Sequence, residues 1–290
     1  MKQSAIISIV IALLVLWLPA NLAFGQPAAA IPTVRFQSQC EVPSAPSQVD
    51  AYQAVLDFAP NQWTSKHTHS GPVCVSQLVG DITFRFDSGL KVVPAGKSYL
   101  EDSNLAHAAG NLAATSARML VTSLTPRGQA QAGASGPAEP NPAPRTFNVK
   151  NEINDLPAQL TIVHLVLDFA PGASTPMQSH GGWALHTVIA GELALQEKSA
   201  QKTVKTGEGW SEAPGLSYAL TNNGAGIASL YETVLLPKGA TLTTDQATRP
   251  ATIPTTGGAA QDWGALWLLI AMAIVALVCG RLLWRKSRRT

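Results

Sequence analysis

The feature that most constrains this chain is an internal repeat with a fixed offset of 111 residues (167 minus 56). The segment Leu-Asp-Phe-Ala-Pro at 56–60 recurs at 167–171. The same offset joins His69 to His180, Gly80 to Gly191, Gly96 to Gly207, Glu101 to Glu212, Asn111 to Asn222, Pro126 to Pro237 and Gly128 to Gly239. Because no insertion interrupts this register, we interpret the chain as two copies of one folding unit.

Each copy has the pattern of a β protein. Apolar residues nearly alternate with polar ones around a tight turn at Gly80-Asp81, and the second copy turns at Gly191-Glu192. Helical periodicity is weak, so short strands with regular turns predict two sandwiches or small barrels. Between the copies, residues 129–150 are rich in small residues and proline and are expected to be a linker.

The two ends of the chain predict export and membrane anchoring. Residues 1–25 have the positive start, apolar run and small residues of a signal peptide cleaved before Gln26, with an uncleaved anchor as the alternative. Residues 263–283 carry one charge and are long enough to span a bilayer as a helix, and the basic tail at 284–290 is expected to stay cytoplasmic. We therefore expect an extracytoplasmic protein held in the cell membrane by its C-terminal helix.

A second signal precedes that span. Ile253-Pro254-Thr255-Thr256-Gly257 resembles the LPxTG motif at which a sortase joins surface proteins to the cell wall. A Thr/Pro/Gly-rich stalk at 241–262 that matches by chance is the alternative, and we favour it because short motifs match often.

Composition limits the partners. The formal net charge is +2 and no basic run occurs outside the tail, which argues against nucleic acid as a partner. Cys40 and Cys74 are able to pair in an oxidising compartment, which would tether the N-terminal segment 26–50 to the first copy.

The motif residues resemble those of the cupin family. His67-Thr68-His69 matches the His-x-His pair of its first motif, and Gly80 follows at the required distance. His107 and Asn111 match the His-x-x-x-Asn of the second motif. In the second copy, His180, Gly191 and Asn222 stand in the matching places.

The resemblance implies a metal site in the first copy. Alternate strand residues share a face, so His67 and His69 point into a barrel together, and His107 completes three converging imidazoles. Such a site suits a divalent Fe, Mn, Zn, Cu or Ni ion. Val73 stands where the family carries a Glu ligand, so the set resembles the three-His site of some thiol dioxygenases. Histidines left over from divergence are the alternative.

The second copy departs further from the family pattern. Gln178, Ala184 and Tyr218 replace the first His, the Glu and the second-motif His, while His180 remains. His186 lies on the inward face and is a possible substitute ligand, with Tyr218 or Gln178 beside it. We favour a polar cluster satisfied by internal hydrogen bonds over a second metal site. Glu101 and Glu212 are shared by both copies, and we favour a role in capping a turn over the alternative of a general base or a partner of a metal ligand.

The predicted fold is all-β, with two tandem cupin double-stranded β-helix barrels. The expected segments are a signal peptide (1–25), an N-terminal segment (26–50), barrel 1 (51–128), a linker (129–150), barrel 2 (151–240), a stalk (241–262), a transmembrane helix (263–283) and a basic tail (284–290).

Two functions fit this prediction. The first is a cell-surface bicupin that binds a transition metal in barrel 1 and performs dioxygenase-like or isomerase-like chemistry on a small molecule. The second is a non-enzymatic module that binds a small ligand or a protein. A purely structural duplication would make three histidines in motif register a coincidence, so it ranks last.

Overall fold

The computed structural model describes residues 30–198 and 200–243, and all regular structure in these ranges is β-strand. No helix in this part of the chain is long and apolar enough to cross a bilayer. The predicted signal peptide, transmembrane helix, basic tail and sorting motif lie outside the described residues, as does nearly all of the stalk.

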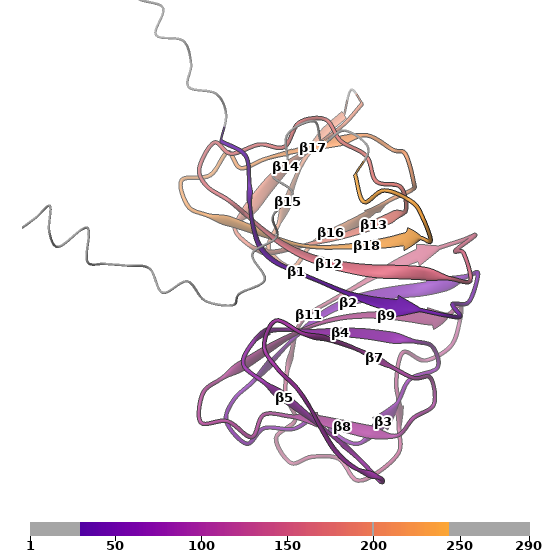
Figure 1. Ribbon diagram of the computed structural model, residues 1–290. Helices are drawn as coiled ribbons and strands as arrows, with labels where there is room; N and C mark the ends of the chain where they lie inside the picture. The colour runs from indigo at the N-terminus through magenta and orange to yellow at the C-terminus, as the bar shows by residue number, and fades with distance from the viewer. Residues whose placement is uncertain (1–29, 199, 244–290) are drawn as a thin grey trace, which may run out of the picture.

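Two barrels contain the strands (Figure 1). Barrel 1 contains β2 (Val49–Phe58), β3 (His67–Thr68), β4 (Val73–Val79), β5 (Ile82–Phe86), β6 (Gly89–Val93), β7 (Ser98–Glu101), β8 (His107–Gly110), β9 (Ala117–Pro126), β10 (Gly133–Ala134) and β11 (Arg145–Ile153). Barrel 2 contains β1 (Thr33–Val42), β12 (Leu160–Phe169), β13 (Trp183–Ala190), β14 (Glu192–Glu197), β15 (Ala200–Lys205), β16 (Gly209–Glu212), β17 (Tyr218–Thr221) and β18 (Ala228–Pro237).

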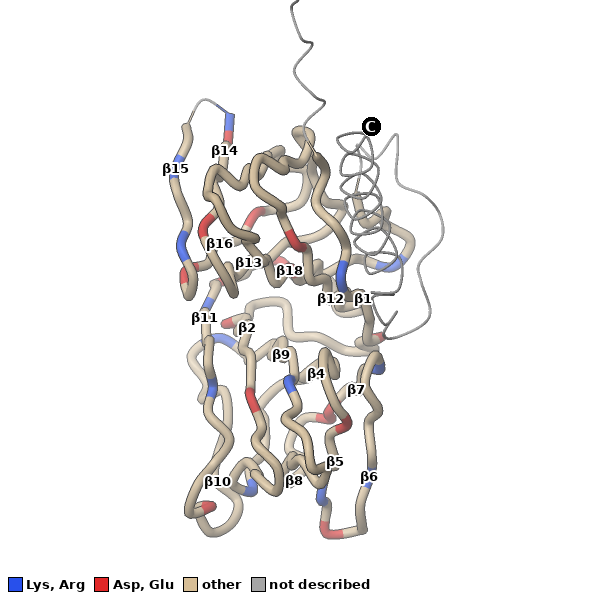
Figure 2. Tube along the Cα trace, turned by 90° about the vertical axis from the view of Figure 1, so that its left-hand side faces the viewer, with Lys and Arg blue, Asp and Glu red and all other residues tan. Residues whose placement is uncertain are grey.

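Each barrel takes its fifth inner strand from outside its own repeat unit. The inner sheet of barrel 1 has the order β11-β2-β9-β4-β7, and that of barrel 2 has the matching order β1-β12-β18-β13-β16. β11 lies 111 residues after the position of β1, so the two are equivalent strands. The strand that precedes each copy therefore pairs with the other copy (Figure 2).

This exchange revises the expected linker. Residues 129–150 form β10 and most of β11, and both strands add to barrel 1 by antiparallel pairing. Ala143 is buried in the core of barrel 1. A short sequence rich in small residues and proline shows no alternation of apolar and polar side chains. Its backbone N–H and C=O groups are nevertheless able to pair with an exposed strand edge, so it forms a strand that the residue pattern does not predict. The N-terminal segment 26–50 likewise includes β1, which pairs with β12 of barrel 2.

The two inner sheets pack face to face, so their strands are buried on both sides. Along β2, Ala54 and Leu56 face the interior of barrel 1, whereas Gln53 and Val55 face barrel 2. Every residue of β2 is therefore buried or partly buried, and the burial pattern is continuous rather than strictly alternating.

A buried polar network crosses this contact. Gln53 donates to the hydroxyl of Thr233 (2.9 Å) and accepts from the hydroxyl of Thr187 (3.0 Å). His164 occupies the equivalent position in the second copy and lies 2.8 Å from Ser76 Oγ and 2.9 Å from Thr122 Oγ1. The partners are also equivalent, since the offset of 111 converts 76 to 187 and 122 to 233.

A disulfide joins Cys40 to Cys74 and connects the barrels covalently. Cys40 lies on β1 in the sheet of barrel 2, and Cys74 lies on β4 in barrel 1. The bond therefore links the exchanged strand β1 covalently to β4 of barrel 1.

The polar network predicts an acid-sensitive contact. Burial lowers the pKa of His164 to about 3, whereas an unfolded histidine titrates near its ordinary value of 6.5. Between these values the unfolded state binds more protons, so the free energy of unfolding falls as the pH decreases from 6.5. The stability difference between wild type and His164→Gln, measured by urea unfolding, should change by about 2 kcal/mol between pH 7.5 and 5.

The replacement copies the first repeat, where Gln53 holds the equivalent place, so it retains hydrogen-bonding capacity. An identical pH dependence in both proteins would show that His164 does not cause the acid sensitivity.

Candidate metal centre

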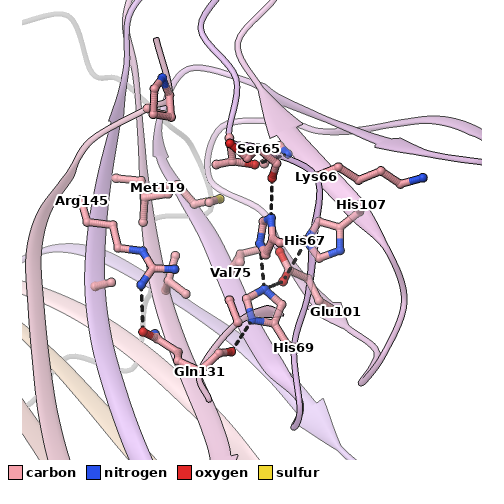
Figure 3. Close-up of a pocket in the computed structure, with 18 of the residues that line it drawn as sticks. Ser65, Lys66, His67, His69, Val75, Glu101, His107, Met119, Gln131 and Arg145 are labelled. Atoms are coloured by element: carbon pink, nitrogen blue, oxygen red, sulfur yellow. Dashed lines mark hydrogen bonds and ion pairs between the residues drawn. The ribbon is translucent and has the colours of Figure 1, made fainter. Parts of the chain in front are cut away.

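Barrel 1 encloses a cavity of about 290 Å³. Apolar side chains including Leu56, Met119 and Val121 form much of its wall. Its polar lining includes Ser65, Lys66, His67, His69, Glu101, His107, Gln131 and Arg145 (Figure 3).

Three predicted ligands converge in this cavity. His67 on β3 lies directly opposite His107 on β8, and His69 follows two residues after His67 on the same side. One ring nitrogen from each residue lies within 4.8 Å of those of the other two. His69 and His107 are buried and His67 is partly buried, so the rings face one another rather than solvent.

Backbone carbonyls fix the orientation of all three rings. The Nδ1 atoms of His67, His69 and His107 lie 2.7, 3.0 and 2.9 Å from the carbonyl oxygens of Ser65, Gln131 and Leu105, respectively. A carbonyl only accepts, so each Nδ1 carries the proton, and the Nε2 of a neutral ring presents a lone pair to the cavity. Burial lowers the pKa of His67 to about 4, which keeps this ring neutral at pH 7.

The spacing of these lone pairs matches a shared cation. The Nε2 atoms of His67 and His69 lie 3.1 Å apart. Two ligand atoms each about 2.1 Å from one ion and at right angles to each other lie about 3 Å apart. Two nitrogen lone pairs at this distance repel unless a proton or a metal ion lies between them.

Glu101 adds a carboxylate that sequence analysis placed in a turn. Its Oε2 lies 3.1 Å from His69 Nε2 and 3.3 Å from His107 Nε2, and neither contact has hydrogen-bond geometry. Burial alone would raise the pKa of Glu101, but positive charge on the facing imidazoles of His107 and His69 overcomes this effect and lowers the pKa to about 2. Burial alone would lower the pKa of His107, but Glu101 in turn raises it, so without a metal ion a proton on the rings balances the carboxylate. The carboxylate is therefore charged and directed at the same point as the rings.

The position of Glu101 explains the missing motif residue. Val73 occupies the place of the family's Glu on β4, and Glu101 on β7 is its direct cross-strand partner. Directly opposed residues have Cβ atoms about 5 Å apart and project to the same face. The carboxylate thus enters the barrel from the neighbouring strand. The repeat of the residue as Glu212, which lies opposite Ala184, is the signal that sequence reasoning had available.

Other motif residues have structural roles. Asn111 donates to the carbonyl oxygens of Phe58 and Thr115 and accepts from the amide of Ala113, so it joins two loops away from the metal ligands. Gly80 has a φ of +68°, and a Cβ there would lie 2.9 Å from the Cβ of Ala117. Glycine is therefore required at this turn.

Barrel 2 brings its four candidate residues into one buried cluster. Tyr218 lies at its centre, 2.7 Å from His180 Nε2, and accepts a hydrogen bond from Gln178 (3.1 Å). His186 lies 3.2 Å from Glu212 Oε2. The hydroxyl of Tyr218 also donates to Glu232 (3.2 Å), which sequence analysis did not single out.

Larger side chains stand in barrel 2 at several positions that line the cavity in barrel 1. Four cavity-lining residues of barrel 1 have larger buried counterparts in barrel 2 at the offset of 111. The pairs are Ala54 and Leu165, Val75 and His186, Ala109 and Leu220, and Val121 and Glu232. The two copies thus share one fold and differ in what occupies the interior.

Comparison with protein-family models gives a match within the second copy. Residues 165–234 match the model of the Cupin domain. No curated protein sequence matches the chain significantly.

Several solved structures align with this chain. Vicilin from Solanum lycopersicum (tomato) aligns with a TM-score of 0.50 and 10% identity, covering 66% of this chain and 76% of vicilin. AerE from Microcystis aeruginosa aligns at 0.44 and 16%, covering 70% and 100% of the respective chains. Oxalate decarboxylase from Lactobacillus farciminis, in a formate complex, aligns at 0.45 and 13%, covering 73% and 86%.

At such identities the vicilin match shows a common fold and nothing about activity. Barrel 1 repeats the strand order of barrel 2 in its inner sheet, although the family model matches only the second copy. Residues 165–234 match the Cupin domain model, and the described residues form a tandem of two β-barrels whose fold resembles that of vicilin.

Proposed function

We propose that barrel 1 binds one divalent transition metal ion and uses it in an enzymatic reaction on a small molecule held in the cavity. The observation that carries this proposal is the set of three Nδ1–carbonyl contacts, which direct three Nε2 lone pairs to one point. Histidines that bind a metal through one ring nitrogen typically donate the N–H of the other nitrogen to a carbonyl or carboxylate oxygen.

The donor set fits such an ion. His67, His69 and His107 would supply three nitrogens, and Glu101 would supply one oxygen and one negative charge. Glu101 Oε2 and His107 Nε2 are buried without a hydrogen-bond partner, and a cation would satisfy both atoms. Imidazole together with carboxylate suits Mn, Fe or Zn, and we place Mn and Fe first because four protein ligands leave two octahedral positions for substrate.

The cavity adds the other requirements of a reaction site. When bound, the ion would supply Lewis-acid or redox chemistry. The apolar wall around Leu56, Met119 and Val121 lowers the local dielectric constant and so strengthens electrostatic interactions inside the cavity. The buried Glu101 carboxylate keeps its negative charge at neutral pH, which offsets part of the charge of the ion.

Metal content tests the proposal. The full chain, purified in detergent without a histidine tag, should contain or take up one Mn or Fe ion, measured by mass spectrometry of the metal. His67→Gln should lower metal affinity more than tenfold because it removes a ligand, and Glu101→Gln should lower it about 10- to 100-fold. Circular dichroism should confirm that both variants remain folded.

The repeat supplies a matched control. His180 is the counterpart of His69, so His180→Gln makes the same kind of change in the other barrel. This variant should retain the metal. A wild-type protein that takes up no Mn, Fe, Zn, Cu or Ni would contradict the proposal, as would equal loss of metal in His180→Gln.

We also propose that the barrels act outside the cytoplasm, anchored by the expected membrane span. The disulfide between Cys40 and Cys74 supports this proposal, because such bonds persist mainly in oxidising compartments. The signal and the span themselves lie outside the described residues.

Surface labelling tests the location. A membrane-impermeant, amine-reactive biotin reagent applied to intact cells should label the protein through exposed lysines such as Lys91 and Lys202. Labelling that requires lysis of the cells, with a known surface protein labelled beforehand, would contradict an extracytoplasmic location.

A further inference from the structure

Arg145 is the feature of the cavity that the metal site does not use. It begins β11, the exchanged strand, and its side chain lines the cavity of barrel 1 (Figure 3). Its Nη1 donates to the side-chain oxygen of Gln131 (2.8 Å), which is neutral. Among the described residues, no carboxylate lies within ion-pair distance of Arg145, so its positive charge has no acidic partner.

The neighbouring lysine differs in this respect. Lys66 also lines the cavity, but its Nζ forms an ion pair with Asp87 at 2.5 Å. Arg145 therefore provides the cationic group of the cavity wall whose charge is not already balanced. A guanidinium presents several N–H donors in one plane and binds a carboxylate through two parallel hydrogen bonds.

Gln131 fixes Arg145 relative to the three histidines. Its side chain accepts from Arg145, while its backbone carbonyl lies 3.0 Å from Nδ1 of His69. One residue therefore holds both the guanidinium and a ring of the metal centre. Figure 3 shows Arg145 and His69 on either side of Gln131.

The second copy provides an internal comparison. The counterpart of Arg145 at the offset of 111 is Val34 on β1. Val34 packs against the hydrophobic clusters of barrel 2, where the counterpart of His67 is Gln178. The arginine thus lines the barrel that has both the cavity and the three histidines, although its strand precedes the second copy in the sequence.

We propose that Arg145 binds the carboxylate of the substrate, so that barrel 1 acts on a small carboxylic acid whose other end reaches the histidines. This inference rests on the proposed function and adds the class of substrate. A cavity of about 290 Å³ has the volume of about ten water molecules, which gives room inside the barrel for on the order of ten non-hydrogen atoms of the acid.

Calorimetric titration of the full chain with malonate, succinate and benzoate tests this proposal, with malonamide, succinamide and benzamide as uncharged probes. At least one carboxylate should bind, and its amide should bind much more weakly. Arg145→Gln and Arg145→Val should weaken carboxylate binding roughly 10- to 100-fold, because charge-assisted hydrogen bonds are lost. Metal content should be unchanged in both variants.

Arg35→Gln is the matched control. Arg35 lies on β1, the counterpart of β11, and pairs with Asp168 outside the cavity. This variant removes the same charge from the chain and should bind carboxylates like wild type. Equal weakening in Arg35→Gln would show a non-specific charge effect and overturn the proposal. Unchanged binding in the Arg145 variants, or no binding of any carboxylate, would also overturn it.

The metal measurement separates this inference from the proposed function. If the protein holds no metal but still binds carboxylates through Arg145, the proposed metal function fails and the anion site stands. If the metal is present and carboxylate binding does not depend on Arg145, the anion site fails and the metal function stands.

Discussion

The exchange of the first strand between the two copies is the constraint on which the rest of the structure depends. β11 precedes barrel 2 in the sequence but completes the inner sheet of barrel 1, and β1 does the reverse. The inner sheets are therefore brought face to face, and the network around Gln53 and His164 forms between them. The same exchange places Arg145 in the cavity of the other copy.

Two copies in one register allow the consequences of each substitution to be compared directly. The inner sheets have equivalent strand orders, and Asn111 and Asn222 make the same loop contacts. The side chains that face the interior differ between the two barrels. Barrel 1 retains the converging histidines and small wall residues. In barrel 2, Tyr218 occupies the position of His107 and brings a hydroxyl group instead of an imidazole.

This divergence has a physical basis. In barrel 2 the charged and polar groups contact one another, since Tyr218 lies within hydrogen-bond distance of His180, Gln178 and Glu232. In barrel 1 the three Nδ1 atoms contact backbone carbonyls, which leaves the Nε2 atoms and the Glu101 carboxylate to face one another. Barrel 2 thus satisfies most of these polar atoms internally, although His186 Nδ1 is buried without a hydrogen-bond partner. An interior that presents only acceptors, as in barrel 1, favours a bound cation.

Sequence predicted the features that depend on local pattern or on the repeat. The duplication and the β architecture follow from spacing and register, and the shared side of His67 and His69 follows from strand alternation. The approach of His107 was implied by the resemblance to the cupin motifs.

The features that sequence missed depend on pairing between distant strands. Glu101 reaches the site because it lies opposite Val73, and this register is set by loops whose geometry is not visible in the residue pattern. The exchange of β1 and β11 joins segments more than a hundred residues apart, as in the pairing of Cys40 with Ile162. No periodic signal within either strand specifies its partner.

The most direct test of the account is anomalous diffraction from crystals of the full chain loaded with Mn or Zn. The account predicts one strong peak in barrel 1, about 2.0–2.2 Å from the Nε2 atoms of His67, His69 and His107 and from Oε2 of Glu101. A peak among His180, His186 and Glu232 instead, or saturating metal with no peak in barrel 1, would contradict it.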